Sequence, residues 1–207
     1  MIPYFHFMKN LFNDLEKELI LAKAPVLSFL TPGIVEVDVI EKLKPIKIML
    51  PFEALNCYEW RNGTHFREGK PVNSQCLFFG VMFPALKEAI ETYKFYSKND
   101  RDFKKYHFPL FETQQGIMYL IDCDVKSKDY GMIMKHDISR AVSPKVVTAI
   151  YDSVSSFVET IIQCYRTGIY RIELQGSERI LMSDYKAEIK LSGELNPNSA
   201  YWKLFDK

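Results

Sequence analysis

The chain has 207 residues, 47% of them hydrophobic and 14% aromatic, and its 27 basic and 26 acidic side chains leave a net charge of +1. A chain of this length and composition can bury a substantial core within a single domain. The even charge balance argues against a dedicated nucleic-acid-binding protein, and no apolar run approaches the roughly 20 residues of a membrane-spanning helix, so we expect neither nucleic acid nor membrane as a partner.

The beginning of the chain is predicted to be helical. Apolar side chains recur at steps of three and four from Phe7 to Ala24, which predicts a first amphipathic helix. Residues 34–44 follow the same rule, with Val37, Ile40 and Leu43 on one side of a second helix. A proline follows each stretch and favours its end.

A third helix is predicted to begin at Pro51, whose missing N–H costs nothing in a first helical turn, and to end before Gly63. After a polar loop over residues 64–74, the apolar run Gln75–Val81 predicts a buried strand. Pro84 then opens another helix. The apolar side chains of that helix share one face: Leu86, Ala89, Ile90 and Tyr93.

The middle of the chain has the pattern of a series of short strands. His107–Glu112 and Ile117–Asp124 are predicted to form a hairpin, and Gly131–His136 and Val146–Ile150 continue the series. Short strands without helices between them favour antiparallel pairing. We therefore expect an α+β fold with a mainly antiparallel sheet of about five or six strands flanked by helices.

The clearest predicted helix spans Asp152–Thr167, where an apolar stripe recurs at helical spacing. Asp152 or Ser153 is a suitable N-cap, and Gly168 ends the helix. The remaining predicted elements are a strand near Ile169–Glu173, a helix around Tyr185–Leu191 and a terminal segment, Asn196–Phe205.

Cysteine usage and the N-terminus favour a cytoplasmic protein. The four cysteines, Cys57, Cys76, Cys123 and Cys164, are widely and irregularly spaced among apolar neighbours. We interpret them as reduced core residues rather than as disulfide partners. The N-terminal residues lack the basic region of a cleaved signal peptide.

No pattern of catalytic or cofactor-binding residues is visible. The histidines lack the spacing of a helical metal site: they are His6, His65, His107 and His136. The serine cluster at residues 153–156 has no G-x-S-x-G setting, and the nine glycines form no phosphate-binding loop. We therefore expect no catalytic site, no metal and no cofactor.

One alternative involves Asp122 and Asp124, which bracket Cys123. Alternation along a strand places both carboxylates on one face, where they could hold a cation or serve a small-ligand protein or a hydrolase. The other interpretation is that these acids end a strand and cap the following turn.

Two groups of short motifs carry a resemblance to a known family. The first group is Pro32-Gly33, a helix with Glu41, Leu50-Pro51 and Asn62-Gly63. The second group is Phe108-Pro109-Leu110, Gly116 and Leu120-Ile121-Asp122. In this order the motifs resemble the SMI1/KNR4 family, also called the SUKH superfamily, over about residues 25–165.

The resemblance implies a fold and a function. The fold is one domain over residues 1–207, with helices first, then an antiparallel sheet, then a late helix packed back on it. Members of the family are known mainly as binding proteins, and many are bacterial immunity proteins that neutralise a partner toxin. The resemblance thus implies a cytoplasmic immunity protein bound to a cognate toxin. A regulatory or scaffold protein of the cell-wall type is the alternative.

A binding protein needs a patch with aromatic or charged anchors. The outer face of the sheet and the loops Arg61–Lys70 and Ser97–Lys105 are candidates, because both loops combine charges with aromatic side chains. The candidate contact residues are Trp60, Arg61, His65, Arg67, Tyr96 and Arg101.

Overall fold

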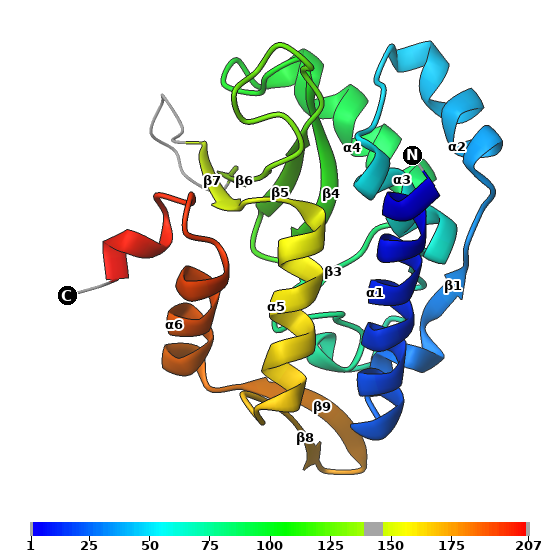
Figure 1. Ribbon diagram of the computed structural model, residues 1–207. Helices are drawn as coiled ribbons and strands as arrows, with labels where there is room; N and C mark the ends of the chain where they lie inside the picture. Colours follow the sequence, from blue (N-terminus) through cyan, green and yellow to red (C-terminus); the bar gives the residue numbers. More distant parts are fainter. Residues whose placement is uncertain (1, 139–146, 206–207) are drawn as a thin grey trace.

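A five-stranded antiparallel sheet in the order β3-β4-β5-β6-β7 forms the centre of the computed structural model, which describes residues 2–138 and 147–205 (Figure 1). Its strands are β3 (Val81–Met82), β4 (His107–Thr113), β5 (Ile117–Asp122), β6 (Ile133–Asp137) and β7 (Thr148–Tyr151). Two separate antiparallel pairs are β1 (Leu30–Pro32) with β2 (Arg61–Thr64), and β8 (Tyr170–Gln175) with β9 (Glu178–Ser183). The predicted α+β class with an antiparallel sheet is confirmed.

Helices cover this sheet and connect its parts. The α-helices are α1 (Ile2–Leu21), α2 (Glu36–Leu43), α3 (Phe52–Trp60), α4 (Leu86–Asn99), α5 (Val154–Arg166) and α6 (Tyr185–Leu195). Short 3₁₀ turns are η1 (Pro25–Ser28), η2 (Lys44–Ile46), η3 (Val72–Ser74) and η4 (Trp202–Phe205). Figure 1 shows α1 and α5 side by side, with the β8–β9 hairpin at the lower end of both.

Aromatic side chains join α5 to the sheet. The ring of Phe157 on α5 lies 4.7 Å from that of Phe78, 4.8 Å from Phe111 on β4 and 4.9 Å from Tyr151 on β7, measured between ring centroids. Phe157 is only 1% exposed. Tilted and edge-to-face pairs of this kind add to the hydrophobic gain of burial, so α5 is fixed on the sheet at its first turns.

The start of α5 confirms the predicted cap. Ser153 is the N-cap, and its hydroxyl accepts a hydrogen bond from the backbone N–H of Ser156 at 3.0 Å. Glu53 on α3 accepts a second one from the N–H of Ser155 at 2.7 Å. A carboxylate at a helix N-terminus is favourable because of the helix dipole, and here it ties α3 to α5.

The first helix also depends on α5. Its buried side, which includes Met8, Leu15 and Leu19, packs against α5 and the core. At the far end of this contact, Arg166 donates from Nε to Glu18 Oε1 at 2.8 Å.

Two glycines among the family-like motifs sit where no side chain fits. A Cβ on Gly33 would lie 1.8 Å from the carbonyl oxygen of Glu59, at the end of α3. Gly63 has φ +82°, and a Cβ there would lie 2.4 Å from the backbone nitrogen of Ala85. Contact between backbones, together with a left-handed conformation at Gly63, explains why these turns require glycine.

The predicted apolar face of α2 is only partly right. Leu43 is buried as predicted, but Val37 and Ile40 are 60% and 42% exposed, and Val39 is buried in their place. The spacing of four between Val39 and Leu43 is as helical as the predicted spacing, and packing against α3 selects it.

One other prediction is wrong, one strand was missed, and one predicted strand begins outside the described residues. The predicted strand Gln75–Val81 is wrong: Cys76, Leu77 and Phe78 are buried, but the strand there is only Val81–Met82. Strand β9 was not predicted at all, although Gly176-Ser177 is a hairpin turn signal. Of the predicted strand Val146–Ile150, Val146 lies outside the described residues.

Candidate partner-binding cleft

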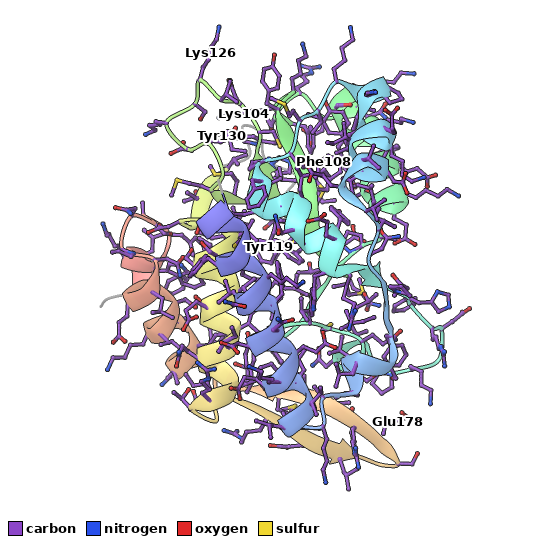
Figure 2. All side chains as sticks on the ribbon, turned by 45° about the vertical axis from the view of Figure 1, so that its right-hand side comes forward. Lys104, Phe108, Tyr119, Lys126, Tyr130 and Glu178 are labelled. Atoms are coloured by element: carbon purple, nitrogen blue, oxygen red, sulfur yellow. The ribbon has the colours of Figure 1, made fainter. Side chains whose placement is uncertain are left out.

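A hollow of about 560 Å³ lies where three segments meet: the end of α1 with η1, the loop between β2 and η3, and the tip of the β8–β9 hairpin. We call it the basic cleft. Its charged residues are Lys23, Arg67, Lys70, Glu178 and Arg179. Its apolar part is formed by Ala24, Pro25, Leu27 and Phe29. Figure 2 shows Glu178 at the tip of the hairpin.

The charge of the basic cleft differs from that of the chain. Four basic side chains and one carboxylate line it, a net charge of +3 at neutral pH, whereas the whole chain carries +1. The remainder of the chain is therefore slightly acidic, at −2. Positive charge gathered in a concave surface attracts anionic groups over several ångströms.

A buried amide fixes the loop that carries Arg67 and Lys70. The side chain of Gln75 is fully buried, and its Oε1 accepts from the backbone N–H of Arg67 at 2.6 Å. Its Nε2 donates to the carbonyl of Arg67 at 3.1 Å and to that of Lys70 at 3.3 Å. The guanidinium of Arg67 lies 5.6 Å from the centre of the Phe29 ring, a cation–π contact. The backbone under both cations is therefore held from inside the protein.

Lys23 stands in an unusual backbone conformation at the end of α1. Its φ is +54°, in the left-handed region that favours glycine. The N–H of Ala24 bonds the carbonyl of Leu19 at 2.9 Å, and the N–H of Lys23 bonds that of Ile20 at 3.0 Å. This pair of bonds is a Schellman motif, in which glycine is the usual residue at the position of Lys23.

The hairpin brings the last charged groups to the basic cleft. Gln175 pairs with Glu178 across the two-residue turn Gly176-Ser177, and Leu181 anchors β9 because it is only 1% exposed. Lys70 Nζ lies 2.6 Å from Glu178 Oε1. This ion pair links the loop to the hairpin across the cleft.

The six predicted contact residues lie in three places. Arg67 lines the basic cleft, and the exposed His65 lies in the same loop, where its N–H donates to the carbonyl of Phe29 at 2.7 Å. Tyr96 is half-buried beside Phe103, and Arg101 is exposed after α4. Lys104 of that loop lies at the opposite end of the molecule from Glu178 in Figure 2.

Trp60 and Arg61 form the third place, where they join α3 to α1. The Trp60 ring stacks on Phe12 at 5.0 Å, and its Nε1 donates to Glu16 Oε2 at 3.0 Å. Arg61 Nη2 bonds Glu16 Oε1 at 2.7 Å, and its guanidinium lies 5.6 Å from the Trp60 ring centre. Both side chains are half-buried and satisfied within the fold.

Lys23 and Arg179 were missed as cleft residues because nothing in the sequence connects them. They are far apart in the chain, and each stands alone among uncharged or oppositely charged neighbours. The positive φ of Lys23 has no sequence signal, since glycine or asparagine would be expected there.

The predicted placement of Asp122 and Asp124 on one face of a strand is wrong. Strand β5 ends at Asp122, and Asp122 Oδ1 accepts from the N–H of Asp124 at 2.9 Å. Asp124 Oδ1 in turn accepts from the N–H of Lys126 at 3.0 Å. The two acids cap successive turns, which was the other interpretation of this pair.

Two buried histidines face carboxylates in the core. His107 Nε2 lies 4.0 Å from Asp122 Oδ2, and His136 Nε2 lies 3.2 Å from Asp100 Oδ2. Burial lowers the pKa of His107 from 6.5 to about 4, although Asp122 opposes the shift. His107 is therefore neutral at pH 7. The side chain of the predicted non-ligand His6 lies outside the described residues.

All four cysteines are free and buried. Burial raises the pKa of Cys76 and of Cys164 to about 12, and it also raises the pKa of Cys57 and Cys123. A thiol must ionise to act as a nucleophile, so these groups behave as small core residues.

Comparison with known proteins does not settle the family. No family model matches the chain, and no curated protein matches it, so the SUKH resemblance stays a prediction from the motifs.

Within residues 2–138 and 147–205, no cluster of three or more His, Cys, Asp and Glu side chains is placed to hold a metal ion. In the same part of the chain, every helix is too short or too polar to cross a membrane.

Proposed function

We propose that the protein is a non-catalytic binding protein that neutralises a partner toxin by covering the toxin's working surface. The basic cleft is the observation that carries this proposal. Its charged side chains stand on backbone that is fixed by buried groups, as Gln75 fixes Arg67 and Lys70. Preorganised charged anchors of this kind reduce the entropy that binding costs and favour the correct partner.

The buried histidine–carboxylate pair and the four thiols do not line the cleft. The His107–Asp122 pair is at most 5% exposed, and the four thiols are buried. The SUKH resemblance supplies the kind of partner, a toxin, and the cleft supplies a surface that suits a protein ligand.

The experiment that tests the proposal begins with capture of the partner. The tagged chain is expressed in its native host, and the captured proteins are identified and expressed alone. We expect one of them to arrest growth, and we expect co-expression of this chain to restore growth. A variant with both Arg67→Glu and Arg179→Glu should rescue poorly. Lys126→Glu is the matched control, because Lys126 is exposed and lies at the opposite end of the molecule from Glu178 in Figure 2.

Two results contradict the proposal. If no captured protein is toxic, the protein is a regulator or scaffold rather than an immunity protein. If a captured toxin still arrests growth when this chain is co-expressed, binding does not neutralise it.

A further inference from the structure

We propose that the basic cleft receives an acidic segment of the partner protein, in which carboxylates alternate with apolar side chains. This inference rests on the proposed function and adds the chemistry of the partner's contact surface. Its carboxylates would lie against Lys23, Arg67, Lys70 and Arg179, and its apolar side chains would lie against the floor of the cleft.

The ion pair inside the cleft already shows how a carboxylate is held there. Glu178 Oε1 lies 2.6 Å from Lys70 Nζ, and the two side chains are 36% and 42% exposed. Exposed ion pairs contribute little to folding, so a carboxylate from a partner can replace Glu178 at small cost. Glu178 thus occupies the position of the partner's carboxylate and competes with it.

The other cations of the cleft have few partners of their own. Glu178 is the single carboxylate among the described lining residues, against four basic groups. Arg67 is held by its cation–π contact with Phe29, which leaves its planar fork of N–H donors suited to bidentate contact with a carboxylate.

The floor of the cleft favours a protein segment over nucleic acid. The half-buried Pro25 and Leu27, beside the nearly buried Ala24 and Phe29, give it apolar surface, which a peptide side chain can cover and a phosphate backbone cannot. Nucleic-acid binding depends on many phosphate contacts and a basic excess, whereas this chain is nearly neutral.

Lys23 carries its charge at a backbone position that favours glycine. A non-glycine residue in the left-handed region is strained, and such strain gathers at functional sites. Lys47, with φ +56°, is the other non-glycine residue of positive φ among the described residues, and it does not line the cleft. It therefore provides a matched control for Lys23.

The test uses the full chain and a short fluorescein-labelled peptide in which glutamate and leucine alternate. Binding is followed by fluorescence anisotropy at low and high salt. We expect Lys23→Gly, Arg67→Gln and Arg179→Gln each to weaken binding about three- to fivefold, as expected for one exposed ion pair. Lys47→Gly and Lys126→Gln should leave it unchanged. High salt should weaken binding by the wild type.

Glu178→Gln gives the sharpest result, because it removes the internal competitor. We expect it to tighten peptide binding about threefold. If Glu178 only supported the fold, its replacement would weaken peptide binding or leave it unchanged. A peptide with glutamine in place of glutamate should not bind, and a single-stranded oligonucleotide of similar length should bind more weakly than the acidic peptide.

The inference is overturned if the wild type does not bind the acidic peptide, if Glu178→Gln does not tighten binding, or if the oligonucleotide binds more tightly. It is also overturned if the captured toxin is bound equally well by wild type and cleft variants. In that last case, growth rescue by the cleft variants would still show neutralisation of the toxin, but through a surface other than the cleft. Conversely, peptide binding without any toxic partner leaves the chemistry of the cleft supported and removes the immunity function.

Discussion

Replacement of Lys23 by glycine should stabilise the fold. Lys23 has φ +54° at the C-terminal end of α1, and the left-handed conformation costs a non-glycine residue roughly 1–2 kcal/mol. Glycine avoids this cost but loses about 0.5–1 kcal/mol through its greater freedom in the unfolded chain. The net expectation is a gain of about 0.5–1 kcal/mol, which corresponds to a rise of about 1–4 °C in Tm for a domain of this size.

The assay is equilibrium denaturation in urea, with the midpoint and slope compared between variants. Lys23→Ala separates the two contributions, because it removes the charge but retains the Cβ that is strained. We expect Lys23→Ala to lie within about 0.5 kcal/mol of the wild type. Lys47→Gly should gain as much as Lys23→Gly, since its φ is +56°. The reasoning is refuted if Lys23→Gly is no more stable than Lys23→Ala.

Three further predictions concern other positions. Gly33→Ala should destabilise by about 3 kcal/mol or more, since its Cβ would lie 1.8 Å from the Glu59 carbonyl oxygen; a normal denaturation midpoint would contradict this. Gln75→Leu should lower the free energy of unfolding by about 2 kcal/mol, because the backbone N–H of Arg67 loses its buried partner. It should also weaken acidic-peptide binding. Unchanged stability and binding would show that Gln75 does not fix the loop. Below pH 6.5, His107 becomes protonated in the unfolded chain but stays neutral in the folded chain, where its pKa is about 4. Lowering the pH from 7.5 to 5 should therefore reduce the free energy of unfolding of the wild type by about 2 kcal/mol more than that of His107→Gln. Parallel pH profiles for the two proteins, measured by urea denaturation, would show that His107 is not the group responsible.

The elements that could be predicted are those whose signals are local. The helix capped by Ser153 carries its cap, its apolar stripe and its glycine stop within a single stretch, and the structure has all three. The hairpin of β4 and β5 has two apolar runs joined by a short turn that ends at Gly116. In both cases each local preference agrees with the final fold.

The errors arose where a local pattern allowed more than one arrangement. In α2, Leu43 lies at helical spacing from both Ile40, as predicted, and Val39, as observed, and only packing against α3 chooses between the two faces. The run from Gln75 is as apolar as a strand, but as far as Gly80 it forms bends and a turn, with an isolated bridge between Phe78 and Val81. Periodicity cannot resolve such cases.

The candidate site was largely beyond sequence reasoning. Arg67 was predicted as a contact residue, and the loop that includes Lys70 was proposed as a binding surface. Arg67 and Lys70 line the same cleft as Lys23 and Arg179 only because η1, this loop and the β8–β9 hairpin lie together in the folded protein. Long-range positions of this kind are set by tertiary packing, which a single sequence does not reveal.

The contact between α1 and α5 affects how the protein folds during its synthesis on the ribosome. Glu18 and Arg166, which bond each other, are separated by 148 residues, so α1 emerges long before the helix that shelters it. During synthesis at roughly 5–20 residues per second, the apolar face of α1 stays without its packing partner, α5, for many seconds. The nascent chain is then open to chaperones, and slowed translation after α1 should lengthen that exposure.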